Sequence, residues 1–429
     1  MMYYSEYSKE QLLNEQASLK AAYKKFLDMG LRLDMSRGKP CAEQLDISVH
    51  MLDIVNSEHD CKSKTGLDCR NYGLLEGLPS CRELFAKLMQ VKPDEVMVGG
   101  NSSLNMMFDT IATFMYTPVC EGAKPWLLVE KRKFLCPVPG YDRHFGITEY
   151  FGFEMIPVPM SETGPDMDMV ESLVEADDTI KGIWCVPKYS NPQGYTYSDE
   201  TVKRFAALKP KAKDFRIIWD DAYCVHDIAD EGDVLISLMD ECRKTGNTEL
   251  PIIFCSTSKI TFPGSGVAAM AAGEKTMEVI HRRYQSQTIG FDKINMLRHM
   301  LFFKDVDGVK AHMQKHKEIL KPRFDMVLKK LDAKLADKGF AKWCKPNGGY
   351  FVSIDVMDNT ASKVVRMCKN AGLVLTSAGA TYPYGNDPKD SNIRIAPTFP
   401  PASELEVAMD VFCVCARLAA VEELLSKLG

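Results

Sequence analysis

The sequence lacks several features that would place it in other classes of protein. No apolar run approaches the ~20 residues that span a bilayer, and the start lacks the basic segment and apolar run of a signal peptide. With a net charge of −5 there is also no dense basic patch or basic arm. We therefore expect a soluble cytoplasmic protein with no membrane partner and no nucleic-acid partner.

Metal-binding patterns are also missing. The chain has 14 cysteines but no CxxC pair with metal spacing. Several cysteines lie in apolar runs, so we expect buried free thiols in a reducing compartment. His312 and His316 are four residues apart in a lysine-rich helical pattern, and we expect them on a solvated helix face. The sequence predicts no metal cofactor.

The pattern of apolar residues predicts an α/β protein. Apolar residues recur at helical spacing over 8–28. From about 80 to 300, helical patterns alternate with short β-rich runs at 126–130, 154–159, 182–187, 216–221 and 251–256. This alternation is typical of a mainly parallel sheet flanked by helices, with functional loops beyond the carboxyl ends of the strands.

The C-terminal third predicts a smaller α+β domain. A long helix is expected over 312–335, interrupted near Pro322, and a strand over 348–356. At 429 residues the chain is long enough for two or three domains. We expect a large domain over 51–304, a small domain over 305–429, and a segment over 1–50 that joins the small domain and closes the active site.

Four loops next to predicted strands or helices carry polar chemistry. Lys259 follows an apolar strand in CSTSKITFPGSG, and a lysine inside a protein is costly to desolvate. Asp220 and Asp221 end another strand, and Asn191 lies in the turn KYSNPQG. The loop VGGNSSL, at 98–104, opens a helix and suits an anion. Each loop alone also fits an ordinary surface turn.

One cofactor, pyridoxal phosphate, would use all four loops. It needs an unprotonated lysine amine, a carboxylate at its pyridine nitrogen, donors to its phenolic oxygen, and a cradle for its phosphate. The candidates, in that order, are Lys259; Asp220; Asn191 with Tyr223; and Asn101, Ser102 and Ser103 together with Ser256 and Ser258.

These residues give the chain a resemblance to the fold-type I, class I aminotransferases. Asn-Pro-Gln-Gly, Asp-Asp-Ala-Tyr, Ser-Thr-Ser-Lys and a late arginine occur in the family's order, over nearly the whole chain. SRGKP, PKYSNPQG and STSKITFPG are most similar to a divergent bacterial subgroup of aspartate aminotransferases. The resemblance implies an enzyme of amino-acid metabolism that moves an amino group from L-aspartate to 2-oxoglutarate by a ping-pong mechanism. It also implies a homodimer with shared active sites.

The resemblance implies roles for individual residues. Lys259 would be the Schiff-base lysine and the general acid/base, and Asp220 would pair with the pyridine nitrogen. Tyr141 would stack on the ring, His144 would support Asp220, and Tyr223 and Asn191 would contact the phenolic oxygen. Arg394, with Asn191, would bind the substrate α-carboxylate. Tyr72 would reach the neighbouring subunit's cofactor, and the loop at Gly38 would close over the substrate.

The chain departs from the family pattern at two points. Gly266 stands where the family commonly has an arginine for the phosphate, and Arg283 is a possible substitute. No arginine matches the one that reads a distal carboxylate. Arg37 and Lys39, in the closing loop, are our candidates for that role, against the alternative of a solvated loop.

The sequence also leaves other functions open. GSGVAA, at 264–269, fits a dinucleotide fingerprint, but no strand ending in an acid follows at about 20 residues, as a dehydrogenase would need. A non-catalytic regulator that has kept the cofactor fold often carries an added DNA-binding segment, and we find no helix-turn-helix extension and no basic arm. A carbon–sulfur β-lyase, a decarboxylase, or an aminotransferase with a different substrate range would share the ring chemistry.

Overall fold

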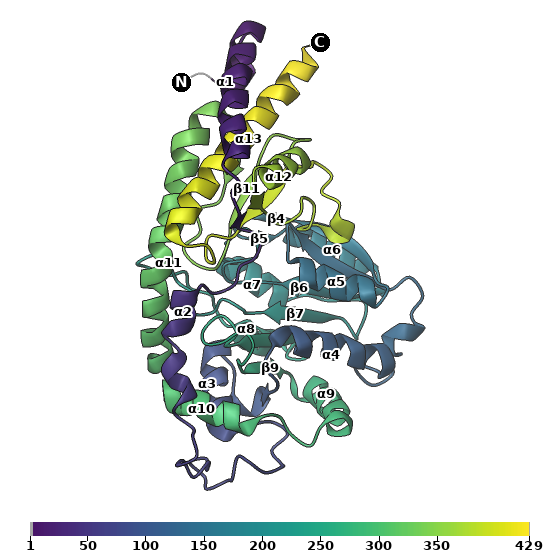
Figure 1. Ribbon diagram of the computed structural model, residues 1–429. Helices are drawn as coiled ribbons and strands as arrows, with labels where there is room; N and C mark the ends of the chain where they lie inside the picture. Colours follow the sequence, from purple (N-terminus) through teal and green to yellow (C-terminus); the bar gives the residue numbers. More distant parts are fainter. Residues whose placement is uncertain (1–2, 429) are drawn as a thin grey trace.

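A computed structural model describes residues 3–428 of the chain; Met1, Met2 and Gly429, at the ends of the predicted terminal segments, lie outside the described residues. An eight-stranded sheet lies at its centre, in the order β2-β9-β8-β7-β6-β3-β4-β5 (Figure 1). The strands are β2 (Val96–Val98), β3 (Lys133–Val138), β4 (Glu154–Ser161), β5 (Gly164–Pro165), β6 (Ile180–Cys185), β7 (Arg216–Asp220), β8 (Pro251–Ser256) and β9 (Ala268–Ala272).

The sheet is mainly parallel, which confirms the predicted α/β class. β4, β3, β6, β7 and β8 pair in parallel, and the outer pairings β4–β5, β8–β9 and β9–β2 are antiparallel. The carboxyl ends of β6, β7 and β8 therefore lie at one edge. Asp220 ends β7 there, and the loops that carry Asn191 and Lys259 start there.

Helices cover both faces of this sheet. One apolar cluster joins one face to α3 (Pro79–Met89), α6 (Met167–Ala176), α7 (Asp199–Ala206), α8 (Leu238–Thr245) and α10 (Lys293–Phe303). A second cluster joins the other face to α4 (Ser103–Tyr116), α5 (Asp142–Tyr150) and α9 (Glu274–Gln287). Because both faces of the sheet are covered, every residue of β6 and β8 is buried, and the two strands show no alternation of buried and exposed positions.

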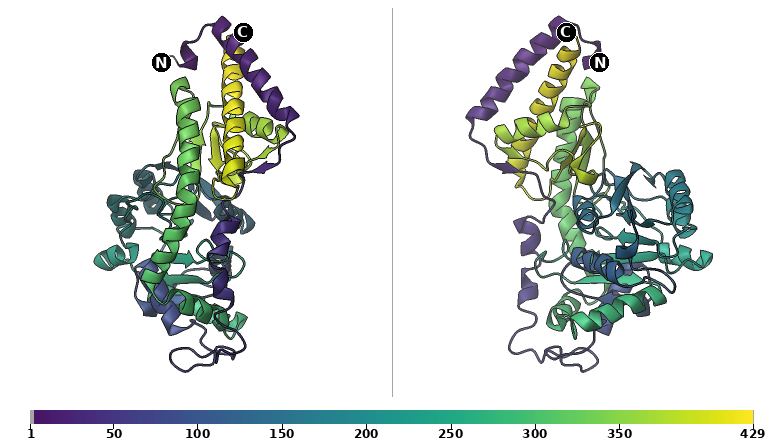
Figure 2. Two further views of the ribbon diagram at one scale, coloured as in Figure 1. Left: turned by 60° about the vertical axis from the view of Figure 1, so that its left-hand side comes forward. Right: turned by 90° about the vertical axis from the view of Figure 1, so that its right-hand side faces the viewer.

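A C-terminal layer lies beside the sheet. It contains α11 (Val306–Leu335), α12 (Ala361–Asn370), α13 (Ala402–Lys427), and an antiparallel sheet of β10 (Lys342–Trp343), β11 (Val352–Asp355) and β13 (Asn392–Ile395). The start of the chain joins this layer: α1 (Lys9–Asp28) packs against α13, and β1 (Leu33–Asp34) pairs with β12 (Leu373–Val374) (Figures 1 and 2). α2 (Ala42–Asp46) then lies against α11.

Short 3₁₀ helices complete the regular structure: η1 (Tyr4–Glu6), η2 (Val49–Leu52), η3 (Pro93–Glu95), η4 (Trp126–Leu128), η5 (Ala336–Lys338) and η6 (Pro383–Gly385). Within residues 3–428 no helix has the length and apolarity to cross a membrane.

The strand predicted at 126–130 is wrong. That segment forms η4, in which Trp126 is buried and donates from Nε1 to Asp214, while Leu127 and Leu128 are exposed. The strand is β3, which contains Pro137, and proline argues against a central strand. β3 tolerates this proline because its pairing with β6 is confined to residues 133–135.

The predictions for the long C-terminal helix were partly wrong. α11 runs through Pro322 without interruption. Proline removes the amide that would bond to the carbonyl of Glu318. Both Pro322 and Glu318 lie on the exposed side of the helix. His312 and His316 are buried and not solvated. The predicted strand at 348–356 is shorter, because β11 begins at Val352.

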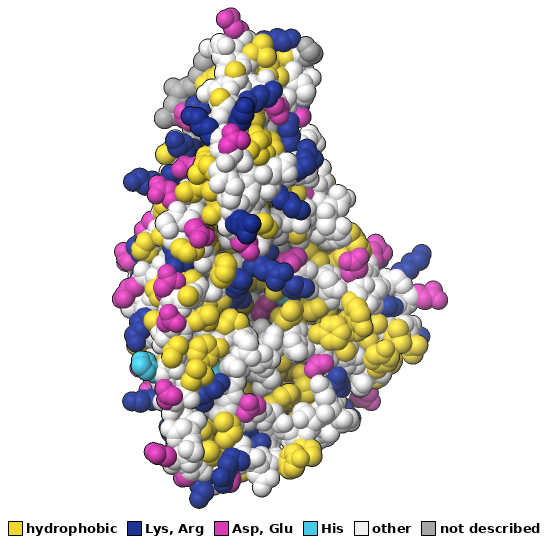
Figure 3. Space-filling model, in the orientation of Figure 1, with side chains coloured by type: hydrophobic (Ala, Val, Ile, Leu, Met, Phe, Trp, Pro, Cys, Tyr) yellow, Lys and Arg dark blue, Asp and Glu magenta, His cyan; other side chains and the backbone are white. Residues whose placement is uncertain are grey.

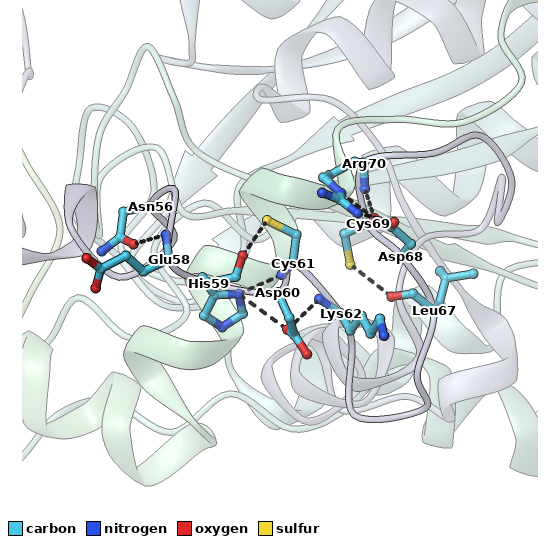
Figure 4. A network of polar contacts seen from close by, with 10 residues as sticks. All are labelled: Asn56, Glu58, His59, Asp60, Cys61, Lys62, Leu67, Asp68, Cys69 and Arg70. Atoms are coloured by element: carbon cyan, nitrogen blue, oxygen red, sulfur yellow. Dashed lines mark hydrogen bonds and ion pairs between the residues drawn. The ribbon is translucent and has the colours of Figure 1, made fainter.

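A long loop extends from the end of the molecule opposite the termini (Figure 2). Residues 53–78 contain a single β-bridge, Lys62 to Asp68, and hold together by local polar contacts (Figure 4). The Cys61 amide donates to His59 Nδ1 at 2.9 Å, and Arg70 Nε donates to Asp68 at 2.9 Å. Tyr72 follows this network and is 77% exposed.

Candidate active site

Lys259 lies in a turn that is fixed from behind. Beyond β8, the amide of Thr257 donates to the carbonyl of Val267 at 2.8 Å, and the amide of Val267 donates to Thr257 Oγ1 at 2.9 Å. His299 Nε2 lies 3.1 Å from the same hydroxyl and 3.0 Å from Thr261 Oγ1. The turn therefore presents Lys259 from a rigid backbone.

The surroundings of Lys259 favour its neutral amine. Its Nζ lies 4.8 Å from the ring centroid of Tyr223 and 5.9 Å from that of Tyr350. Burial lowers the pKa of Lys259; Asp220 opposes this shift and the guanidinium of Arg394 adds to it. A neutral amine is the form of lysine that acts as a nucleophile or a base.

Asp220 ends β7 in a buried pocket. Its Oδ2 lies 3.1 Å from His144 Nε2, and its Oδ1 is buried without a hydrogen-bond partner among the described residues. The ring of His144 stacks on Trp184, with centroids 4.3 Å apart and planes at 10°. Asp220 is thus held by one oxygen while the other is left for a further donor.

Two tyrosines and an asparagine adjoin these groups. Tyr223 is buried three residues beyond Asp220, and burial raises its pKa well above the usual range. Tyr141 precedes α5, with its ring 4.9 Å from that of His144; burial, with Asp220, raises its pKa to about 12. Asn191 is buried in the loop after β6, before a cis proline.

The serines and Asn101 meet at the start of α4. Ser256 Oγ donates to Ser258 Oγ at 3.1 Å, and Ser258 Oγ donates to the carbonyl of Asn101 at 3.3 Å. Ser102 precedes α4 without a side-chain cap bond, and Ser103 is its first residue. The structure therefore brings all five predicted phosphate contacts together at a helix N-terminus, where amides and the helix dipole favour an anion.

No arginine joins this cradle at Gly266, and Arg283, the predicted substitute, makes its ion pair elsewhere. A Cβ at Gly266 would lie 3.1 Å from Thr257 Oγ1 and 3.2 Å from the amide of Ser258, so a larger residue would push against the lysine turn. Arg283 pairs with Asp109 at 3.3 Å on the outer side of α4 and α9. The cradle is built from hydroxyls and backbone.

Arg394 reaches the site from β13. It is buried, and Nη1 donates to Asn191 Oδ1 and to Asp142 Oδ1, each at 3.1 Å. Its guanidinium carbon lies 4.7 Å from the ring centroid of Phe351. A Cβ at Gly38 would collide with that same ring, so the N-terminal loop reaches Phe351 only because residue 38 is glycine.

Three predicted site residues lie apart from these contacts. Arg37 and Lys39 are exposed, and Lys39 Nζ lies 3.8 Å from the ring centroid of Phe399. Tyr72 is exposed on the long loop. The structure places none of the three in the polar contacts around Lys259 or Arg394.

Sequence reasoning missed a buried polar network behind the lysine turn. His312 Nε2 and His316 Nε2 each lie 2.9 Å from the carbonyl of Ile260. Gln44 Nε2 lies 2.8 Å from His316 Nδ1 and 2.9 Å from the hydroxyl of Tyr350. The apolar residues of α11 recur with the two histidines at helical spacing, and that periodicity could have placed both on the buried face. Asp142 was also missed, and the sequence offers no signal for it.

Comparisons with known proteins agree with this geometry. The aspartate amino-transferase family matches residues 7–427. The chain is 44% identical over 404 residues to an aspartate aminotransferase of Corynebacterium glutamicum, covering 94% of this chain and 93% of the relative. A crystal structure of an aspartate transaminase from C. glutamicum superposes with a TM-score of 0.96 at 42% identity, covering 98% and 99% of the two chains.

A more distant structure shows the same fold. The α-aminoadipate aminotransferase LysN of Thermus thermophilus, crystallised with N-(5'-phosphopyridoxyl)-L-leucine, superposes with a TM-score of 0.72 at 18% identity, covering 97% of this chain and 98% of that one. The fold, the site and the relatives together define an aminotransferase of fold type I, a class that depends on pyridoxal phosphate. More specifically, the chain belongs to the aspartate amino-transferase family.

Proposed function

We propose that this aminotransferase moves the amino group of L-aspartate to 2-oxoglutarate by a ping-pong mechanism. The observation that carries the proposal is the meeting of three groups. These are the lysine amine of Lys259, the carboxylate of Asp220, with one oxygen that has no partner among residues 3–428, and the buried guanidinium of Arg394. Aspartate as the donor is supported by the 44% identity to a protein named aspartate aminotransferase.

The residues present fit pyridoxal phosphate. Asp220 Oδ1, buried without a partner among the described residues, suits a protonated ring nitrogen, and the hydroxyls before α4 suit a phosphate. When bound, the cofactor supplies a carbon that takes up the amino group and a ring that withdraws electrons. The residues that would hold it are Lys259 and Asp220, with Tyr141, Asn191 and Tyr223 at the ring and Asn101, Ser102, Ser103, Ser256 and Ser258 at the phosphate.

Each side chain of the site then has its own role in the reaction. Arg394 binds the α-carboxylate of the amino acid, and its planar fork fixes the orientation of Cα. Lys259 Nζ, whose neutral form burial favours by lowering the pKa, accepts the proton from Cα and gives it up later in the same half-reaction. Asp220 would face the ring nitrogen, and His144 holds that carboxylate in place. Gly38 lets the N-terminal loop close beside Arg394.

We also propose a homodimer in which Tyr72 reaches the partner's cofactor. Tyr72 is exposed on a loop without a core of its own, which supports an intermolecular role. Hydrophobic side chains gather where α4 and α5 lie (Figure 3), and Tyr116 and Tyr150, at the ends of these helices, are 72% and 74% exposed. Such apolar surface favours association.

We propose domains over 1–50, 51–304 and 305–429, with the first segment joined to the third, a division supported by the β1–β12 pairing. Arg37 and Lys39 remain candidates for the distal carboxylate, because both are exposed cations next to Gly38. A cytoplasmic location is a prediction that cell fractionation tests.

Initial-rate kinetics test the proposed reaction. With L-aspartate and 2-oxoglutarate varied together, we expect parallel double-reciprocal lines, because the first product leaves before the second substrate binds. Intersecting lines would contradict the ping-pong order. A panel of amino acids tests the donor: a clear preference for another amino acid would replace aspartate. Release of a thiol from a sulfur amino acid without any 2-oxo acid would favour the carbon–sulfur lyase.

A further inference from the structure

The guanidinium that we assign to the substrate carboxylate already holds a carboxylate of the protein. Asp142 Oδ1 lies 3.1 Å from Arg394 Nη1. Asp142 is the first residue of α5, which packs on the central sheet, whereas Arg394 lies on β13 of the C-terminal layer. The ion pair therefore bridges the two parts of the molecule at the active site.

The geometry of this ion pair is that of a weak, exchangeable contact. Asp142 contacts the guanidinium through one oxygen only, while a bidentate carboxylate would use two. The side chain of Asp142 is 35% exposed and that of Arg394 is 7% exposed. Arg394 thus cannot escape to solvent, but Asp142 can leave it and be hydrated at a low cost in free energy.

Arg394 keeps other contacts when Asp142 leaves. Nη1 also donates to Asn191 Oδ1 at 3.1 Å, Nη2 donates to Thr376 Oγ1 at 3.4 Å, and the ring of Phe351 lies against the guanidinium. Its Nε is buried without a partner among residues 3–428. A carboxylate that replaces Asp142 would meet an arginine whose position is still fixed and which has a further N–H to offer.

We propose that Asp142 is an internal competitor of the substrate: it occupies Arg394 in the free enzyme and is displaced by the α-carboxylate of the amino acid. This inference rests on the proposed role of Arg394. Asp142 then sets the apparent affinity of the carboxylate site, because every carboxylate ligand must displace it from the guanidinium. The apparent affinity for every carboxylate ligand is reduced by the fraction of enzyme in which Asp142 is bound to Arg394.

Succinate binding to the enzyme loaded with pyridoxal phosphate tests this competition. Succinate has two carboxylates but no amino or oxo group, so calorimetry measures binding without turnover. We expect Asp142→Asn to lower the succinate Kd by roughly 3- to 10-fold, since the competing charge is gone. Glu149→Gln is the matched control: it removes one negative charge from an exposed position of α5 and should leave the Kd unchanged.

The outcomes separate this proposal from the one on which it rests. If Arg394→Gln binds succinate as tightly as the wild type, Arg394 is not the carboxylate site and the proposed function fails at that point. If Arg394→Gln loses binding but Asp142→Asn leaves the Kd unchanged or raises it, the competition is refuted and Arg394 keeps its role. Asp142→Ser, which also removes the carboxylate, replaces Asp142→Asn if the latter does not fold.

Discussion

At the residue scale, the site depends on charges placed where water is scarce. Asp220 and Asp221 are adjacent and both buried, yet their surroundings differ. Asp220 is held by His144, whereas Asp221 Oδ1 has no partner within the described part of the chain. Burial raises the pKa of Asp221 to about 7, with Lys188 opposing the shift and Asp220 adding to it. Asp221 should therefore affect stability in a pH-dependent way.

Asp221→Asn should stabilise the protein at pH 8, by about 2–4 kcal/mol. Because the folded-state pKa is raised from 3.8 to about 7, the folded state holds more protons than the unfolded state between these values. Stability of the wild type therefore falls as pH rises through this window, and the variant escapes the loss. Thermal unfolding from pH 5 to pH 8 measures the gap. If the difference in stability between Asp221→Asn and the wild type does not widen as pH rises, the raised pKa of Asp221 is contradicted. Asp358→Asn, at an exposed position, is the control.

Arg394→Lys should raise KM for the amino donor at least about 10-fold, because lysine keeps the charge but loses the planar fork. Initial rates with L-aspartate measure this change. Arg32→Lys, the same substitution at an exposed position, should leave KM unaltered. An unchanged KM in Arg394→Lys would remove Arg394 from substrate binding.

At the scale of elements, α11 does more than connect two parts of the molecule. It supplies His312 and His316 to the carbonyl of Ile260, directly after Lys259, and α2 supplies Gln44 to the same network. Burial lowers the pKa of both histidines, and for His316 to about 4. The neutral form of His316 suits the contacts, because Nδ1 accepts from Gln44 while Nε2 donates to Ile260.

His316→Ala should destabilise the protein by about 1–3 kcal/mol, since a buried amide loses its acceptor and a carbonyl loses a donor. Urea denaturation measures the loss. Lys315→Ala, next along α11 but exposed, should change stability by less than about 0.5 kcal/mol. Equal effects of the two substitutions would show that the network does not stabilise the lysine turn.

Individual elements show which parts of the fold and the site could be predicted from the sequence. The strands at 182–187, 216–221 and 251–256 were predicted because their apolar runs end in turn residues or acids. β3 was missed because Pro137 within it and Pro139 directly after it resemble a loop. The phosphate cradle around Ser256 could be predicted because its hydroxyl side chains lie next to a predicted strand and a predicted helix. The contact of Asp142 with Arg394 could not be predicted, because it joins residues 252 positions apart through tertiary packing alone.

At the scale of the whole molecule, the exposed loop of Tyr72 leads to a test of the proposed dimer. Tyr72→Phe and Lys259→Ala subunits should each have low activity alone. Mixed and re-associated, they should regain activity, because one site of each hybrid dimer then combines Lys259 from one subunit with Tyr72 from the other. Activity no greater than the sum of the two separate variants would contradict a shared site; mixing each variant with itself is the control.

The central claim is that this protein takes the amino group from L-aspartate, and its most direct test follows the first half-reaction by itself. The protein loaded with pyridoxal phosphate is mixed with L-aspartate alone, and oxaloacetate and the visible absorption band are measured together. The account predicts about one oxaloacetate per subunit, loss of the band, and its return with 2-oxoglutarate, with none of these changes in Lys259→Ala. A band that persists without oxaloacetate would reject aspartate as the donor. A Lys259→Ala protein that behaves as the wild type would refute the role of Lys259.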